Sequence, residues 1–181
     1  TWFKRFAGPR RCYEIWNEPD LFSWKATTAE YLRFYAETAK AIRAADSTAK
    51  IGGAGLNHWE GQIPEDRQGN LNLALIRHAA GERLPLDFVS WHWFYGPAAE
   101  IGKARATFAK EAETAGLAPY PEFFITEWNA PQELRGTEYA ASLHAAALLA
   151  FHRAGMAAQM VAAWEDFDPH PAGLSDYGLV T

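Results

Sequence analysis

Apolar runs typical of β-strands alternate along the chain with longer runs of helical periodicity, and this order constrains the fold more than any other feature. Five strands are predicted, at residues 12–16, 49–53, 86–94, 122–127 and 160–164. Four helices are predicted between them, at residues 28–45, 71–80, 98–115 and 137–154. Because strands that alternate with helices form parallel βαβ units, we expect an α/β fold with a parallel sheet. A doubly wound sheet and a (β/α)8 barrel both have this order, so the order alone does not choose between them.

Local residues mark several of these boundaries. Pro19 ends the first strand, because proline cannot donate a hydrogen bond to a neighbouring strand. The run Thr27-Thr28-Ala29-Glu30 is a capping box that opens the first helix. Gly81, Gly116 and Gly155 are expected to end the other three helices.

Composition excludes several classes of protein. Of 181 residues, 49% are hydrophobic and 22% are charged, which suffices for the core of one domain or of part of a larger one. Seventeen Lys and Arg against 22 Asp and Glu give a net charge of −5 without a basic stripe, so nucleic-acid binding is not expected. The longest apolar stretch, residues 145–150, is too short to span a membrane. Residues 1–11 lack the pattern of a signal peptide, and the cellular location stays open.

No motif for a metal or a cofactor is present in the sequence. The histidines and acidic residues lack the spacing of a zinc site, and no glycine-rich phosphate loop occurs. The single cysteine, Cys12, excludes a disulfide within the chain. We therefore expect neither a cofactor nor a metal.

Two glutamates follow predicted strands at equivalent positions. Glu18 comes after the strand at 12–16 in the run Trp16-Asn17-Glu18-Pro19, and Glu127 ends the strand at 122–127. In barrels, the carboxyl ends of the strands form the active site, so both side chains are expected to face each other there. Opposed carboxylates are what glycoside hydrolysis needs. The alternative for each glutamate is a helix cap or a surface ion pair.

The motifs around both glutamates resemble those of clan A glycoside hydrolases, and within that clan they are most similar to family 39, which includes β-xylosidases and α-L-iduronidases. The resemblance covers nearly the whole chain and is carried by Tyr13 to Leu21 with Trp24, Ile51-Gly52-Gly53, Asp87 to His92, Ile125 to Asn129, and Trp164 with Asp166. It implies a (β/α)8 barrel and a retaining, β-xylosidase-like O-glycosidase with a glycoside or oligosaccharide as substrate.

The resemblance also assigns roles to individual residues. Glu18 would be the general acid/base and Glu127 the nucleophile of a double displacement. For this, the resemblance requires that Glu18 be protonated near neutral pH, with its pKa raised by burial and by Glu127. Hydrogen bonds would keep the pKa of Glu127 low.

Further residues are expected to contact the sugar. The family often has a tyrosine two positions after the histidine of the sixth strand, where this chain has Phe94 followed by Tyr95. His58 and Trp59 lie on a loop at the active-site face and would contact a second sugar. The alternative for His92 and Trp164 is a role in packing alone. The expected sugar-binding residues are Asn17, His92, Tyr95, Trp164 and His58.

Strand alternation places Glu14, Trp16 and Glu18 on one face of the sheet, so Glu14 is expected inside the barrel below Glu18. No cation stands at its level in the other predicted strands, so its role is expected to be structural and its partner to lie outside them.

A closed (β/α)8 barrel needs eight strands, whereas five are predicted here. With the family resemblance, these five correspond to strands four to eight, and residues 1–181 to the C-terminal portion of a glycosidase catalytic domain. Open sheet edges would favour self-association and poor activity of the chain alone.

A different class of function, a catalytically inactive glycan-binding or scaffold fragment, stays open. An open-sheet hydrolase or dehydrogenase is disfavoured by the lack of G-x-S-x-G and G-x-G-x-x-G motifs.

Overall fold

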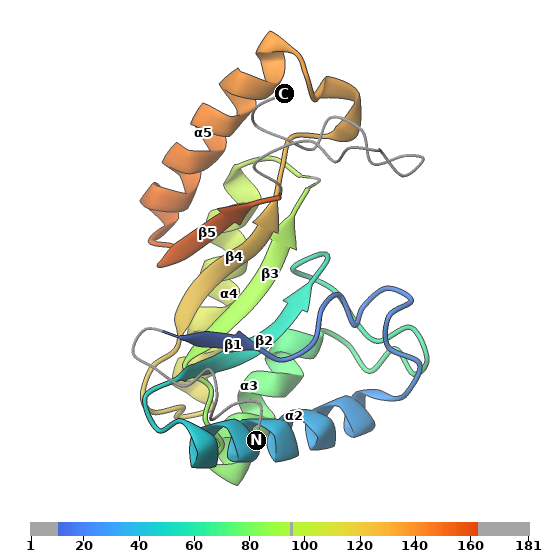
Figure 1. Cartoon of the computed structure of the whole chain (residues 1–181), viewed down its shortest axis with the longest axis vertical. Helices are drawn as coiled ribbons and strands as arrows, with labels where there is room; N and C mark the ends of the chain where they lie inside the picture. The colour runs from blue at the N-terminus through green and yellow to red at the C-terminus, as the bar shows by residue number, and fades with distance from the viewer. Residues whose placement is uncertain (1–10, 95, 163–181) are drawn as a thin grey trace.

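A curved sheet of five parallel strands forms the centre of the molecule (Figure 1). The computed structural model describes residues 11–94 and 96–162. Neighbours in the sequence are neighbours in the sheet, in the order β1-β2-β3-β4-β5. The strands are β1 (Cys12–Glu14), β2 (Lys50–Leu56), β3 (Phe88–Trp93), β4 (Glu122–Trp128) and β5 (Ala158–Val161).

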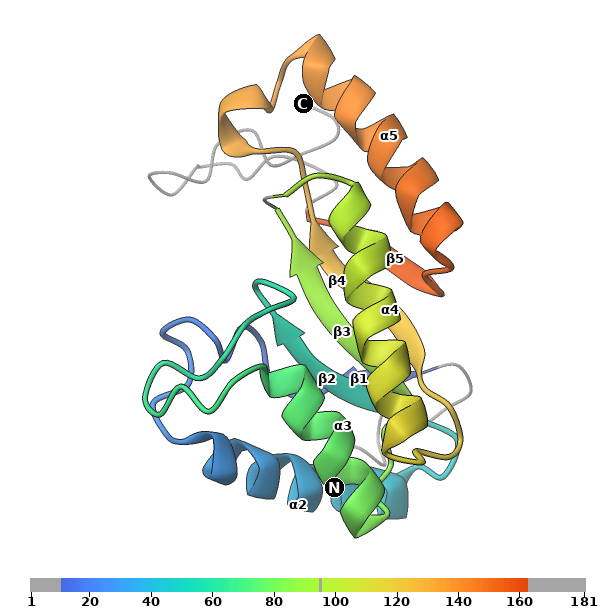
Figure 2. The same cartoon turned by 180° about the vertical axis from the view of Figure 1, so that it is seen from behind.

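The connections between the strands are helical, as the sequence predicts. The helices are α2 (Thr28–Ala45), α3 (Leu71–Glu82), α4 (Ala99–Thr114) and α5 (Glu138–Ala154), with a short 3-10 turn, η1 (Gln132–Leu134), before α5. Figures 1 and 2 show that α3 and α4 cover one face of the sheet, while no helix formed by the described residues covers the other face. This one-sided arrangement is a curled half-barrel that matches part of a (β/α)8 barrel and excludes a doubly wound sheet.

Capping residues fix several of the helix ends. The predicted capping box is present at α2, where Thr27 and Glu30 exchange hydrogen bonds between side chain and backbone. Gly155 caps α5 in the left-handed conformation, as expected. The expectation for Gly81 is wrong, because this residue lies inside α3 and Arg83 takes the left-handed cap position.

The hydrophobic core lies between the sheet and the helices. Tyr31 and Tyr35 of α2 are fully buried in it, and their hydroxyls donate to the carbonyl oxygens of Ile15 and Pro85. On β3, Trp91 projects into this core and packs on Phe108 of α4. Each residue that points to the helices therefore leaves its neighbours in the strand on the opposite, inner face.

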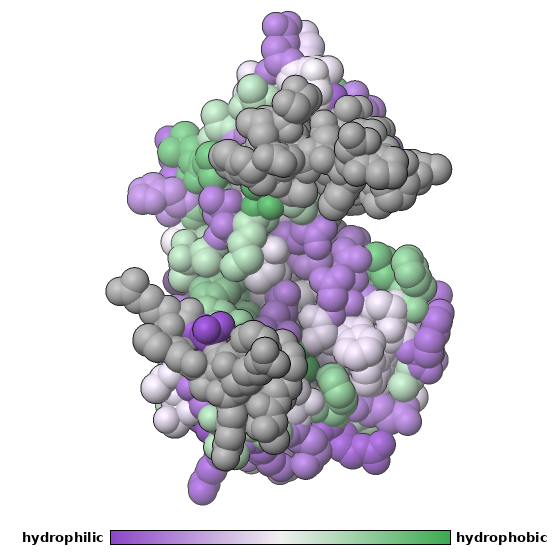
Figure 3. Space-filling view, in the orientation of Figure 1, coloured by the Kyte–Doolittle hydropathy of each residue, from purple (hydrophilic) through white to green (hydrophobic). Residues whose placement is uncertain are grey.

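The inner face combines aromatic and polar side chains. Phe88 of β3 and Phe124 of β4 stack there, with ring centroids 4.4 Å apart. Gly52 of β2 makes room for them, since a Cβ at this position would lie 2.2 Å from the carbonyl oxygen of Phe88. Figure 3, which shows this side of the molecule, has hydrophilic residues gathered over its middle.

The strand boundaries differ from the predicted ones by one to three residues, with β2 reaching Leu56 rather than residue 53, and two predicted site residues are not covered. The first strand ends at Glu14 rather than at residue 16, and the fifth spans 158–161 rather than 160–164. Tyr95 and Trp164 lie outside the described residues. No helix within residues 11–94 and 96–162 has the length and apolar character needed to cross a membrane.

Candidate active site

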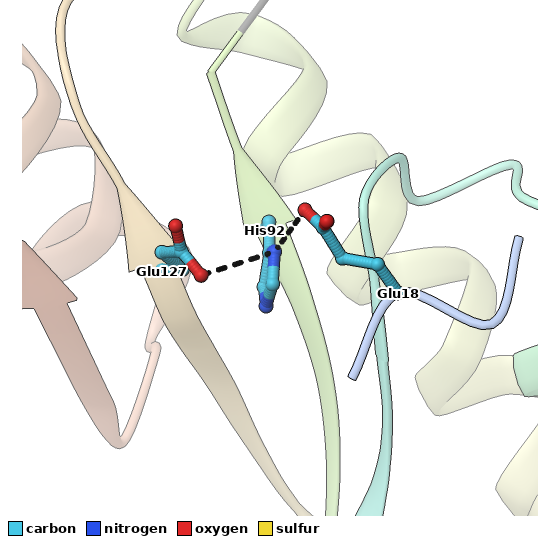
Figure 4. A group of neighbouring side chains, drawn as sticks. All are labelled: Glu18, His92 and Glu127. Carbon is cyan, nitrogen blue, oxygen red and sulfur yellow. Dashed lines mark hydrogen bonds and ion pairs between the residues drawn. The ribbon is translucent and has the colours of Figure 1, made fainter. Parts of the chain in front are cut away.

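Two carboxylates and one imidazole meet at the carboxyl end of the sheet (Figure 4). Glu18 follows β1, His92 lies on β3 and Glu127 lies on β4. The Nδ1 atom of His92 is 2.9 Å from Oε1 of Glu18 and 3.7 Å from Oε2 of Glu127. One carboxylate oxygen of each glutamate and one imidazole nitrogen all lie within 4.8 Å of one another. The structure thus brings together three residues that the sequence singled out, with the buried imidazole between the two carboxylates.

A strained turn aims Glu18 at this place. Trp16 and Glu18 both have left-handed backbones, with φ of 77° and 46°, which are unfavourable for residues with a side chain. The N–H of Glu18 donates to the carbonyl of Gly55 at 2.9 Å. Ser23 Oγ accepts from Trp16 Nε1 and lies 2.7 and 2.8 Å from the carbonyl oxygens of Asn17 and Glu18, to one of which it donates. These hydrogen bonds offset the backbone strain and hold the turn.

The same turn corrects the expected placement of Trp16. Strand alternation predicts Glu14, Trp16 and Glu18 on one face, but the strand ends at Glu14 and the left-handed residues break the alternation. The ring of Trp16 instead packs edge-on against Trp24 and Phe34, with centroids 5.1 and 5.6 Å apart. Because Phe34 belongs to α2, Trp16 is directed to the helical side of the sheet.

An irregularity in strand register accompanies the placement of Glu127. On β4, Phe123 and Ile125 point into the helical core, so simple alternation would send Glu127 there as well. The register shifts between Trp91 and His92 on β3, and between Ile125 and Trp128 on the β4–β5 side. With these shifts, Glu127 pairs with His92 and its carboxylate faces the inner side.

Asn57 and Asp20 also belong to the site, and the sequence analysis missed them. Asn57 Nδ2 donates to Oε1 of Glu18 at 2.9 Å. The two carboxylate oxygens of Asp20 accept from the backbone N–H groups of Asn57 and His58, at 2.9 and 3.1 Å. The signal for Asn57 was available, since it directly follows β2 at the same edge of the sheet as Glu18 and Glu127.

The pKa directions of the two glutamates are the reverse of those expected. The hydrogen bond from His92 lowers the pKa of Glu18, burial opposes this, and the hydrogen bond from Asn57 adds to the lowering. Burial raises the pKa of Glu127, His92 opposes this, and the charges of Glu18 and Glu14 add to the rise. The expectation failed because His92 and Asn57 both direct their hydrogen bonds at Glu18.

The other predicted sugar-binding residues lie beside the cluster. Asn17 is exposed and precedes Glu18 in the turn. His58 is half-buried beside Asn57 in the loop after β2, and its Nδ1 accepts from the N–H of Glu60. Trp59 is only 6% exposed and packs on Phe108, so it is a core residue and not a second sugar contact.

Glu14 lies on the inner face, as expected, but its partner was not foreseen. Thr126 Oγ1 of β4 donates to Oε1 of Glu14 at 2.7 Å. Gly55 packs directly on this carboxylate, where a Cβ would lie 3.0 Å from the carboxyl carbon. The partner of Glu14 is therefore a neutral hydroxyl on β4, whereas the sequence led us to expect a partner outside the five strands.

The contacts within the cluster are those of a hydrogen-bonded network. The 2.9 Å between His92 Nδ1 and Glu18 Oε1 is the length of a direct hydrogen bond, and Asn57 donates to the same oxygen. These two donors orient the Glu18 carboxylate. Glu127 Oε2, at 3.7 Å from His92 Nδ1, lies beyond hydrogen-bond length and interacts with the imidazole through its charge.

Comparison with known proteins agrees with this geometry. Residues 9–152 match the glycosyl hydrolases family 39. The chain belongs to this family. The matched residues include every element from β1 to most of α5, and with them Glu18, His92 and Glu127.

Two β-xylosidases that this chain is similar to are longer than the chain. A β-xylosidase of Caldicellulosiruptor saccharolyticus is 30% identical over 132 residues, which are 65% of this chain and 25% of that protein. A β-xylosidase of Geobacillus stearothermophilus is 33% identical over 82 residues, which are 44% of this chain and 15% of that protein. The chain thus matches a quarter or less of the length of these relatives.

Solved structures show the same fold. The family 39 enzyme of Xanthomonas axonopodis pv. citri superposes with a TM-score of 0.69 at 21% identity, over 94% of this chain and 37% of that one. The half-barrel therefore corresponds to part of a larger glycosidase barrel.

Proposed function

We propose that this chain carries the catalytic carboxylates of a retaining O-glycosidase, with Glu18 as general acid/base and Glu127 as nucleophile. The observation that carries the proposal is the pair of facing carboxylates, with an oxygen of each within 4.8 Å of the other (Figure 4). Retaining enzymes place their carboxyl groups about 5–5.5 Å apart, whereas inverting enzymes need roughly 6.5–9.5 Å to admit a water molecule. The pair supports retention.

The chemistry is a double displacement. Glu127 attacks the anomeric carbon and forms a glycosyl ester, while Glu18 gives its proton to the departing oxygen. Glu18 then takes a proton from water, and the resulting hydroxide cleaves the ester and restores Glu127. Each step inverts the anomeric centre, so the product retains the original configuration.

The reversed pKa directions set a condition on this mechanism. Glu18 must be protonated for the first step, yet His92 and Asn57 favour its ionised form. A sugar bound between the carboxylates would exclude water, and this desolvation raises the pKa of Glu18. Once Glu127 is esterified its charge is gone, and the same two donors then favour the ionised Glu18 that acts as base. The hydrogen bonds therefore suit the second step better than the first.

The relatives guide the choice of substrate. Two of them are β-xylosidases, so we propose a β-linked xyloside or a related glycoside as substrate. We further propose that residues 1–181 are the C-terminal portion of a catalytic domain, with β1 to β5 as strands four to eight. For the chain alone, the second candidate is a catalytically inactive glycan-binding or scaffold fragment. The lowered pKa of Glu18 favours this candidate, because an ionised Glu18 cannot donate a proton.

Turnover of aryl glycosides separates these functions. Aryl xylosides, glucosides, galactosides and iduronides are offered to this chain and to a longer protein that contains it, each as wild type and as Glu127→Ala. We expect xyloside hydrolysis by the longer protein, loss of at least a thousandfold in Glu127→Ala, and little turnover by the chain alone. Equal rates for wild type and Glu127→Ala in the longer protein would contradict the enzyme proposal.

A further inference from the structure

One oxygen of the Glu18 carboxylate receives two hydrogen bonds. Oε1 lies 2.9 Å from Asn57 Nδ2 and 2.9 Å from His92 Nδ1. An amide nitrogen can only donate, so Asn57 binds a lone pair of Oε1. In a neutral carboxyl group the carbonyl oxygen is the better acceptor, which leaves the proton to Oε2.

We propose that Asn57 is a positioning residue for Glu18, which holds Oε1 together with His92 and so presents Oε2 to the bound glycoside. This inference rests on the proposed function for the role of Glu18, but its contacts are independent of any activity. Asn57 itself acts only through Glu18.

A brace from the neighbouring loop fixes Asn57 in turn. Asp20 lies two residues after Glu18, and its carboxylate accepts from the backbone N–H groups of Asn57 and His58. Gly61 closes over this brace, because a Cβ there would lie 2.2 Å from Oδ2 of Asp20. The loop that carries Glu18 and the loop that carries Asn57 are thus tied together beside the carboxylate.

A second aspartate ties the loop that carries Asn57 to the start of α2 and makes no hydrogen bond with Glu18. The carboxylate of Asp66 accepts from the backbone N–H and the hydroxyl of Thr28, both at 2.8 Å. Thr28 begins α2 and is buried. Asp66 therefore offers a matched control for Asp20, with two accepted hydrogen bonds and no contact with Asn57.

The charged groups around Glu18 are few among the described residues. His92 faces it from β3, Glu127 from β4, and Asp20 from its own loop. Glu14 lies close enough to affect Glu127. Asn57 is uncharged, so a change at Asn57 alters hydrogen bonding to Glu18 and leaves these charges in place.

The first test follows the Glu18 carboxyl by carbon-13 NMR during a pH titration of this chain, with Glu18→Gln identifying its signal. Asn57→Leu keeps the volume and removes the donor, so the ionised form is less favoured and the pKa of Glu18 should rise. Asp20→Asn should raise it by less, because the loss of the negative charge of Asp20 beside Glu18 acts in the opposite direction. Asp66→Asn should leave the pKa of Glu18 unchanged. An unchanged titration in a folded Asn57→Leu protein would overturn the proposal. If Asn57→Leu does not fold, the proposal would be overturned by equal shifts of the Glu18 pKa in Asp20→Asn and Asp66→Asn.

The second test uses kinetics in a longer protein that contains this chain. Asn57→Leu should lower kcat about tenfold for substrates with poor leaving groups, because they need a proton from a positioned acid. Activated aryl glycosides, which leave without protonation, should be affected little. Equal losses for both substrate types would indicate a structural role only. An absence of any hydrolysis would contradict the proposed function, while the titration would still decide the role of Asn57.

Discussion

Glu18 and Glu127 face the same imidazole but have different surroundings. Glu18 receives hydrogen bonds from His92 and Asn57, while burial dominates at Glu127. Folding therefore favours the ionised form of the first carboxyl group and the neutral form of the second. Their effects on stability consequently have opposite signs.

The pH dependence of two isosteric variants tests this contrast. The raised pKa of Glu127 means that its favourable contribution is present below the unfolded-state value and is lost as the pH rises through the folded-state value. Glu127→Gln should therefore raise Tm at pH 7, by roughly 2–4 °C. Near about pH 3, below the usual pKa of glutamate, it should change Tm little.

Glu18→Gln should behave in the opposite way. The lowered pKa of Glu18 gives a favourable contribution above the unfolded-state value, which is lost as the pH falls. This variant should lower Tm at pH 7 and have little effect in acid. Thermal melts followed by circular dichroism at both pH values measure the difference. A stabilised Glu18→Gln together with a destabilised Glu127→Gln would reverse the assignment of the two environments.

The proposed catalytic roles of Glu18 and Glu127 can be separated by azide in a longer protein that contains this chain. In Glu18→Ala, azide should intercept the glycosyl ester on Glu127 and give a glycosyl azide of retained configuration. In Glu127→Ala, azide should attack the sugar directly and give the inverted product. Proton NMR of the anomeric centre distinguishes the two products. Swapped configurations would mean that the roles of Glu18 and Glu127 are exchanged.

At the scale of residues, the strand-end argument correctly predicted that Glu18 and Glu127 lie together, but it did not predict their environment. Glu18 and Glu127 face each other because the ends of parallel strands converge at one edge. Asn57 follows the same rule and was overlooked beside His58 and Trp59. The pKa order could not be predicted, because it depends on which carboxylate His92 approaches within 2.9 Å.

Strand β2 shows how an element is shaped by what it lacks. Three of its seven residues are glycines, Gly52, Gly53 and Gly55. The space they leave is occupied by side chains from the neighbouring strands: Phe88 beside Gly52, and Glu14 beside Gly55. Small residues in this strand therefore allow larger aromatic and acidic groups on the inner face.

Two glycine-to-alanine substitutions should have opposite effects on stability. Gly52→Ala would place a Cβ 2.2 Å from the Phe88 carbonyl, so β2 and β3 must separate, and we expect a loss of about 2 kcal/mol or more. Gly81 lies inside α3 with open space around it, and Gly81→Ala should gain about 0.5–1 kcal/mol. Urea denaturation of both variants measures the two effects. A destabilised Gly81→Ala would contradict the helical placement of Gly81.

At the scale of elements, the alternating order of strands and helices was predictable, because it depends on periodicity over many residues. The ends were less so. β1 stops at Glu14 because of left-handed residues that no pattern announces, and Gly81 is tolerated within α3 because Arg83 caps it. The register shifts beside His92 and Glu127 likewise depend on the assembled sheet.

The molecule as a whole has a sheet with two edges. Within the described residues, β1 pairs only with β2 and β5 pairs only with β4. Met160 on β5 is 47% exposed. Unpaired strands with exposed apolar residues promote association between chains.

We therefore expect this chain to self-associate in a concentration-dependent way in sedimentation velocity. Met160→Lys should shift it towards the monomer, because a charged side chain disfavours pairing at the β5 edge. Leu148→Lys removes a comparably exposed residue, 45% exposed on α5, and should have less effect. If Leu148→Lys dissociates the chain and Met160→Lys does not, the surface of α5 rather than the sheet edge drives association.

The only cysteine of the sequence lies on β1, one of the two edge strands of the described sheet. Cys12 is exposed on β1, and partial burial raises the pKa of its thiol, so we expect it to react with an alkylating reagent more slowly than a free thiol does. Anything that covers this edge, whether another copy of the chain or the preceding strands of a complete barrel, would shield the sulfur. The alkylation rate of the Cys12 sulfur therefore reports whether the β1 edge is covered, as it would be in a closed barrel. The measurement needs no introduced label.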